Sequence, residues 1–179
     1  MKLTFDLKRG TLKAEFICPD MEDLSYLIDT GADTPVWCKG EAEFLDLFPD
    51  AKKLDSKFIL SGFGKEPEVV DVYRLSEFSL SDGKEDVLYR NLVLAVTNRP
   101  QINVDLILPS SLFDHMIVEI DRMMSVVYPR ITITSQTKEY PVFFRQIQLT
   151  EAQKSILGIE TDVIIRDVYA QEQQPEIDK

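Results

Sequence analysis

One short stretch constrains this chain more than any other: Leu27-Ile28-Asp29-Thr30-Gly31-Ala32-Asp33. The apolar run Tyr26-Leu27-Ile28 predicts a strand that ends at an acid, which places the Asp29 carboxylate at the rim of a sheet. Gly31 can adopt backbone angles that other residues avoid, so the chain can turn sharply there. We expect backbone N–H groups of the turn to point at the carboxylate and fix it, and Thr30 to hydrogen-bond to a neighbouring strand or chain. The stretch predicts a rigid, exposed and well-oriented acid.

This stretch resembles the active-site loop of aspartic proteases, in which two apolar residues precede Asp-Thr-Gly. The Gly-Ala-Asp continuation is most similar to the retroviral type, the retropepsins. The alternative is an ordinary turn between two strands, where Asp, Thr and Gly are all common.

A second stretch, residues 58–73, predicts a long β-hairpin. A strand at 57–60 leads into the turn Ser61-Gly62-Phe63-Gly64, and Val69-Val70-Asp71-Val72-Tyr73 returns. The resemblance implies that this hairpin is the flap that closes over a bound peptide. A flap needs mobile glycines near its tip and backbone N–H groups that pair with an extended substrate. The alternative is any hairpin of an all-β protein.

The third matching segment is an apolar strand at 104–108, followed by Pro109 and a predicted short helix at 110–116. In retropepsins a buried strand runs into a glycine and then a short helix behind the catalytic loop, so Pro109 is a departure. Viral members also place an arginine just after that glycine, paired with the second Asp of the loop. Residues 110 and 111 are both serine here. The partner of Asp33 is therefore open among Lys39, Arg74 and Arg122.

The remaining pattern predicts an all-β chain with one or two short helices. Strands are expected at 2–8 and 11–17 (a hairpin), 24–28, 34–38, 77–80, 87–97, 117–121, 124–128, 131–134 (exposed) and 162–165, and helices at 41–48 and 150–157. The resemblance covers residues 1–128 and implies a retropepsin-like closed β-barrel, one half of an acid protease. Residues 129–169 are then a C-terminal extension of unknown role, and residues 170–179 are a polar tail expected to be disordered.

Composition argues against nucleic-acid binding, a membrane span, secretion and histidine-based catalysis. The net charge of −11 disfavours nucleic acid as a partner, since phosphate binding needs clustered Lys and Arg. No apolar run reaches the length of a membrane span, and the N-terminus has no apolar signal core, so we expect a cytoplasmic protein with reduced thiols at Cys18 and Cys38. The single histidine, His115, argues against a histidine metal site or a Ser-His-Asp triad.

The resemblance implies a specific mechanism. Aspartic proteases need two carboxylates that share a proton, and this chain has one Asp-Thr-Gly, so the expected enzyme is a homodimer with Asp29 of each subunit on a twofold axis. It would hydrolyse an extended polypeptide with no metal or cofactor. Thr30 and Gly31 would position Asp29, and Ala32, Asp33, Gly62, Phe63 and Gly64 would bind substrate. Asp33 either contacts substrate or is held in a structural ion pair, and Trp37 is a candidate for lining a side-chain pocket.

Two other readings stay open. The first is a non-catalytic protein- or peptide-binding module on the same fold, which Pro109 and the C-terminal extension favour. The second is an unrelated all-β protein, in which residues 58–73 would lie far from Asp29. A variant of the protease hypothesis makes the C-terminal region a self-processed segment that controls activity.

Overall fold

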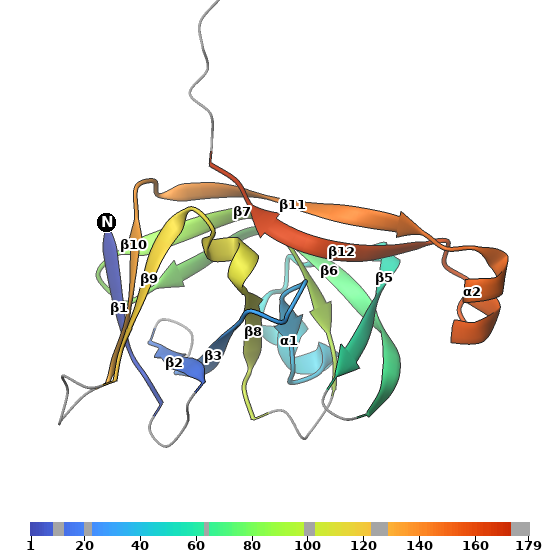
Figure 1. Ribbon diagram of the computed structural model, residues 1–179, viewed down its shortest axis with the longest axis horizontal. Helices are drawn as coiled ribbons and strands as arrows, with labels where there is room; N and C mark the ends of the chain where they lie inside the picture. Colours follow the sequence, from blue (N-terminus) through green and yellow to red (C-terminus); the bar gives the residue numbers. More distant parts are fainter. Residues whose placement is uncertain (9–12, 20–22, 63–64, 99–102, 123–128, 173–179) are drawn as a thin grey trace, which may run out of the picture.

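The computed structural model describes residues 1–8, 13–19, 23–62, 65–98, 103–122 and 129–172, and these form a mainly β fold (Figure 1). The predicted class, mainly β with one or two short helices, is confirmed. The elements of the described residues are β1 (Lys2–Asp6), β2 (Ala14–Cys18), β3 (Leu24–Asp29), β4 (Val36–Trp37), α1 (Glu41–Leu47), β5 (Lys52–Gly62), β6 (Lys65–Ser81), β7 (Asp86–Val96), β8 (Leu106–Pro109), the 3-10 helix η1 (Ser110–Phe113), β9 (Met116–Asp121), β10 (Arg130–Ser135), β11 (Glu139–Gln148), α2 (Glu151–Leu157) and β12 (Val163–Ala170).

The strands of the described ranges form two sheets, and part of the larger sheet closes into a ring. A nine-stranded sheet has the order β11-β12-β5-β6-β7-β4-β8-β3-β2, and a three-stranded sheet has the order β1-β10-β9. Because β11 also pairs with β7, the strands β5, β6, β7, β11 and β12 close on themselves. A closed ring is therefore present, but two of its five strands come from beyond residue 128, outside the range in which the closed barrel was predicted.

The hairpin predicted at 58–73 is present but longer, since β5 and β6 extend beyond it at both ends. The strands expected separately at 69–73 and 77–80 are one strand, β6. Leu75 and Phe78 are buried, and the two residues between them are exposed. This polar pair interrupts the apolar pattern of the sequence, but the strand continues through it.

Helix α1 packs on the sheet through an aromatic cluster. Trp37 contacts Phe44 and Phe48, and its Nε1 donates to the Gly40 carbonyl at 3.0 Å. Trp37 is fully buried, so its expected place in a substrate pocket is wrong.

Cys18 and Cys38 are both buried thiols, and burial raises the pKa of Cys38 to about 12.

The segment after residue 128 pairs with the N-terminal strands. β10 lies between β1 and β9, and its Ile131 and Ile133 are fully buried, so the expected exposed strand at 131–134 is an internal one. The expected hairpin of 2–8 with 11–17 is present only in part, because β1 pairs with β10 and β2 with β3. Among the described residues, the two segments meet at the antiparallel bridge of Leu7 with Phe16 and at Lys8, whose N–H donates to the Glu15 carbonyl at 2.8 Å.

The sequence predicted the bounds of α2 better than those of η1. The helix expected at 110–116 stops at Phe113, because β9 begins at Met116. The helix expected at 150–157 is α2, which begins with a capping box of Thr150 and Gln153 and ends at Gly158, whose φ is +65°.

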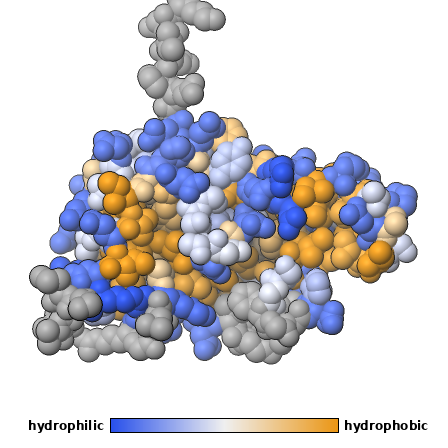
Figure 2. Space-filling view, viewed as in Figure 1, coloured by the Kyte–Doolittle hydropathy of each residue, from blue (hydrophilic) through white to orange (hydrophobic). Residues whose placement is uncertain are grey.

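Several predicted features fall outside the described residues: the turn of the hairpin of 2–8 with 11–17, Phe63 and Gly64 of the flap tip, the strand at 124–128, and the tail from residue 173. Within the described ranges, no helix combines the length and apolar character that crossing a membrane would require. Figure 2 shows an apolar area over β9, where Ile117 and Ile120 are exposed, and another toward α2, where Ile156 is exposed.

Candidate active site

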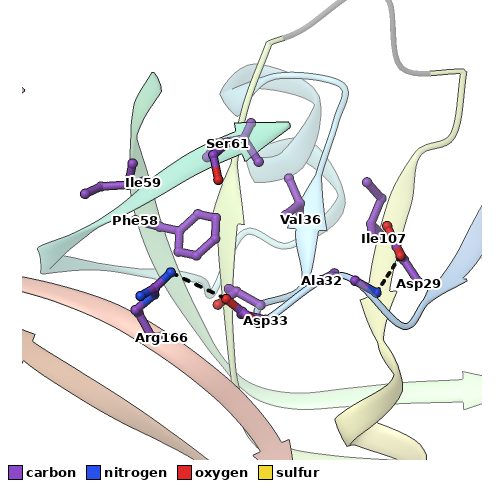
Figure 3. A pocket seen from close by; sticks show the side chains of 12 residues that line it. Asp29, Ala32, Asp33, Val36, Phe58, Ile59, Ser61, Ile107 and Arg166 are labelled. Atoms are coloured by element: carbon purple, nitrogen blue, oxygen red, sulfur yellow. Dashed lines mark hydrogen bonds and ion pairs between the residues drawn. The ribbon is translucent and has the colours of Figure 1, made fainter. Parts of the chain in front are cut away.

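Asp29 ends β3 at the rim of the sheet. β3 runs parallel to β8 and pairs Asp29 with Pro109, and the buried residues Leu27 and Ile107 anchor this pair of strands in the core. The Gly31 N–H donates to Asp29 Oδ1 at 2.8 Å, as the dashed line in Figure 3 marks. The predicted turn that aims a backbone N–H at the carboxylate is therefore present, and Asp29 itself is partly exposed.

Gly31 is needed for space rather than for an unusual backbone angle. Its φ is not positive, in contrast to Gly40, Gly62, Gly83 and Gly158, so the expected reason for this glycine is wrong. A Cβ added at residue 31 would lie 3.3 Å from Asp29 Oδ1, closer than most real Cβ contacts. A side chain at residue 31 would therefore have to push the carboxylate away by a few tenths of an ångström.

A pocket of about 100 Å³ lies between the Asp29 turn and β5 (Figure 3). The turn contributes one wall, β5 contributes the opposite wall, and β12 contributes one residue at the end. Its lining consists of Asp29, Gly31, Ala32, Asp33, Thr34, Val36, Phe58, Ile59, Leu60, Ser61, Ile107 and Arg166. The hairpin therefore lies against the Asp29 turn, which contradicts the reading in which residues 58–73 lie far away.

The other predicted site residues lie as follows. Thr30 and Gly31 are exposed at the turn, and Ala32 is partly buried and lines the pocket. Gly62 is exposed at the end of β5, has a φ of +108°, and pairs with Lys65. Phe63 and Gly64, which complete the predicted flap tip, lie outside the described residues.

Asp33 is held by β12, and its partner there is none of the three candidates predicted from the sequence. Arg166 Nη2 lies 3.7 Å from Asp33 Oδ2, and the Val168 N–H donates to the Asp33 carbonyl at 2.8 Å. Figure 3 shows Arg166 pointing from β12 toward Asp33. Lys39 pairs with Asp105 instead.

The other two candidates lie away from Asp33. Arg122 donates to the Lys13 carbonyl at 2.7 Å, and Arg74 is exposed on β6, opposite Lys52 of β5. No sequence signal could have identified Arg166, since it lies far along the chain in a segment outside the matched motifs.

Thr34 is the second residue that sequence reasoning missed. It is fully buried, lines the pocket, and among the described residues its Oγ1 has no hydrogen-bond partner. A buried hydroxyl without a partner is uncommon, because its desolvation is not compensated. The only indication in the sequence was that a small polar residue follows Asp33, and such residues are too common after a turn to be informative.

The chemistry available at this site is that of a fixed carboxylate. An ionised carboxylate has about four acceptor positions, and one backbone N–H occupies one of them in Asp29, so it can still accept from a water. In the described ranges, no three His, Cys, Asp or Glu side chains come together in a way that could hold a metal ion.

No protein-family model matches the chain, and no curated protein matches it. A solved structure that is similar is the crystal structure of a retropepsin-like aspartic protease from Rickettsia conorii. It is 16% identical in sequence, the match covers 75% of this chain and 91% of that chain, and the TM-score is 0.45. What this chain does is therefore inferred from its own residues.

Proposed function

We propose that this protein is an aspartic endopeptidase that acts as a homodimer on extended polypeptides. The observation that carries the proposal is Asp29 itself. It sits at the rim of the sheet, its Oδ1 accepts from the Gly31 N–H at 2.8 Å, and it lines a pocket against the β5–β6 hairpin. Residues 29–33, Asp-Thr-Gly-Ala-Asp, are also the residues that resemble the retropepsin active-site loop.

The second carboxylate comes from a second copy of the chain. The sequence has one Asp-Thr-Gly, and Asp33 in the same pocket is paired with Arg166. Thr30 and Gly31 are exposed at the turn, so two turns can face each other across a twofold axis. This arrangement brings two Asp29 carboxylates together, and like charges so close retain one proton between them.

The reaction then needs no covalent intermediate. The ionised Asp29 takes a proton from a bound water, and the water oxygen bonds to the peptide carbonyl carbon. The protonated Asp29 of the partner subunit donates to the carbonyl oxygen, which gives a neutral tetrahedral diol. When the C–N bond breaks, the leaving nitrogen takes a proton from the carboxyl group that deprotonated the water, and the ionised carboxylate takes a proton from one diol hydroxyl, so the products are a carboxylic acid and an amine and the pair again holds one proton.

The hairpin offers a backbone edge for the substrate. β5 pairs with β6 along its length, whereas the pairing of β5 with β12 in the described residues is at Lys57 with Ile164. Residues 58–61 of β5 lie beyond this bridge and line the pocket beside Asp29. An extended peptide can add to such an edge through main-chain hydrogen bonds.

The test is substitution of Asp29 by Asn, measured with a mixture of unstructured peptides and mass spectrometry of the products. We expect cleavage by the wild type, and a loss of at least about a thousandfold in Asp29→Asn, because the shared proton and the general base are both removed. Asp46→Asn, an exposed carboxylate on α1, is the matched control. Sedimentation should give a mass of twice 20.5 kDa for all three proteins. An Asp29→Asn protein with full activity would disprove the proposal.

The second candidate is a non-catalytic peptide-binding module. The contact of β12 with the Asp29 turn favours it, since Val168 and Arg166 both engage Asp33 and occupy one side of the turn. A protein that stays monomeric at all concentrations, binds peptides and cleaves none would establish this function.

A further inference from the structure

The strand β12 is fixed at Val168 by two hydrogen bonds, one to the Asp29 turn and one to η1. The Val168 N–H donates to the Asp33 carbonyl at 2.8 Å, and Ser111 Oγ of η1 donates to the Val168 carbonyl at 2.6 Å. Val168 is fully buried. This part of β12 is therefore a wall of the candidate active site.

An irregularity in β12 aims Arg166 at the pocket. Asp167, between Arg166 and Val168, has a φ of 50°, which non-glycine residues seldom adopt, and Arg145 Nη2 lies 2.6 Å from its carboxylate. The pairing register of β11 with β12 shifts at the same place, between Phe143 and Arg145. Such irregularities redirect side chains, often next to functional sites.

The pair of Arg166 and Asp33 is loose and accessible. The charged atoms are 3.7 Å apart, and the side chains are 48% and 49% exposed. A guanidinium group has five N–H donors, and a carboxylate has only acceptors. The pair therefore presents donors and acceptors side by side at one end of the pocket, with Asp29 on the same lining.

The rest of the pocket selects for length and shape. Val36, Phe58, Leu60 and Ile107 provide an apolar lining, and the buried Thr34 hydroxyl adds a group that can both donate and accept. The volume of about 100 Å³ is well below the ~300 Å³ of the smallest typical ligand pockets, so it suits one side chain of a substrate.

We propose that Arg166 and Asp33 make this pocket selective for a carboxamide side chain, that of glutamine or asparagine, next to the bond that is cleaved. The amide oxygen accepts from Arg166, the amide NH2 donates to Asp33, and the aliphatic stem contacts the apolar lining. A glutamate side chain would place a third carboxylate beside Asp33 and Asp29, and a lysine would meet Arg166. The inference rests on the proposed peptidase function and names its substrate class.

The experiment uses the full-length protein and matched octapeptides that differ only at the position that product analysis places beside the cleaved bond. That position carries Gln, Glu, Leu or Lys. We expect kcat/KM for the Gln peptide to exceed that for the Leu peptide by about tenfold, the size of one or two net hydrogen bonds. In Arg166→Met the Gln-to-Leu ratio should fall to within about twofold, and Thr34→Val, of the same shape, should lower it in part. Arg90→Met, which removes an ion-paired arginine of β7 that does not line the pocket, should keep the wild-type ratio.

Each outcome decides the assignment. The assignment is overturned if the wild-type protein cleaves all four peptides equally well. It is also overturned if the Gln-to-Leu ratio of kcat/KM is the same in Arg166→Met as in the wild type. An equal loss of selectivity in Arg90→Met also overturns it, because the effect would then be a general one on the fold. Calorimetric binding of the same peptides to Asp29→Asn separates the two proposals. Selective binding of the Gln peptide that depends on Arg166, without any cleavage by the wild type, would sustain the pocket assignment and overturn the peptidase function.

Discussion

At Asp29 the orientation of the carboxylate depends on a close contact within the turn. The Gly31 N–H reaches Oδ1 at 2.8 Å because residue 31 has no side chain, and an added Cβ would lie 3.3 Å from the same oxygen. The turn therefore uses the small size of glycine to hold the carboxylate against the backbone.

We predict that Gly31→Ala lowers peptidase activity by about tenfold or more while the protein remains folded. The methyl group must push the carboxylate away by a few tenths of an ångström, and small misplacements of reacting groups are costly to rate. The measurement is kcat/KM on a cleaved peptide together with the thermal unfolding midpoint. Unchanged kcat/KM would show that the contact does not govern orientation, whereas a large fall in the midpoint would assign the loss to folding.

The individual residues differ in how far the sequence could identify them. Asp29 and its backbone donor follow from a local pattern of strand, acid and glycine, because all the atoms involved lie within three consecutive residues. Arg166 and Thr34 could not be identified in this way. The first reaches the site through the pairing of distant strands, and the second is distinguished only by its burial and its lack of a partner.

Among the elements, the turn between β6 and β7 is organised by one carboxylate. Asp82 Oδ1 accepts from the N–H groups of Lys84 and Glu85, both at 2.9 Å, and Oδ2 accepts from the Thr4 N–H of β1 at 2.8 Å. This side chain therefore connects β1 to the hairpin of β6 and β7.

We predict that Asp82→Asn lowers the free energy of unfolding by about 1–3 kcal/mol near pH 7, the range for hydrogen bonds to a charged group. Partial burial raises the pKa of Asp82, but the N–H groups of Glu85, Thr4 and Lys84 outweigh it, so the pKa lies below its usual value. A lowered pKa contributes stability that is complete above the unfolded value of about 3.9 and is lost as pH falls through the folded pKa.

The measurement is urea unfolding of both proteins between pH 2 and pH 7, monitored by the fluorescence of the buried Trp37. The difference between wild type and Asp82→Asn should shrink as the pH falls below about 4. Asp86→Asn, an exposed carboxylate at the start of β7, serves as the control. A difference that stays constant down to pH 2 would contradict the role of the charge.

Elements with strong local signals were predictable. The capping spacing and terminal glycine of α2 and the apolar run of β7 both carry them. Strands whose identity depends on distant partners were not. β10 shows an alternating pattern that is equally compatible with an edge strand, and only its position between β1 and β9 explains why Ile131 and Ile133 are fully buried.

For the whole molecule, the decisive feature is that β11 and β12 close the ring. Tyr140, Ile165 and Val168 of these strands are fully buried in the common core. Burial of each large apolar side chain contributes about 1.5–3 kcal/mol, and a typical domain has a net stability of only about 5–15 kcal/mol. The segment from 139 to 170 therefore contributes a large fraction of the stability.

We predict that a chain ending at residue 138 does not unfold cooperatively, whereas a chain ending at residue 172 matches the full-length protein. The shorter chain lacks two strands of the ring and leaves β5 and β7 without these neighbours. Urea unfolding followed by Trp37 fluorescence measures both. A cooperative transition in the shorter chain would show that residues 1–138 form an independent domain and would revive the idea of a removable C-terminal segment.

Closure by the last strands also sets the order of events on the ribosome. β5, β6 and β7 are complete when residue 96 has been added, but their neighbours in the ring are complete only at residue 170. At ordinary rates of synthesis this interval is roughly 4 to 15 s. During that time the nascent chain carries open strand edges that can pair with any other extended polypeptide. We therefore expect newly made chains to aggregate when completion of β11 and β12 is delayed.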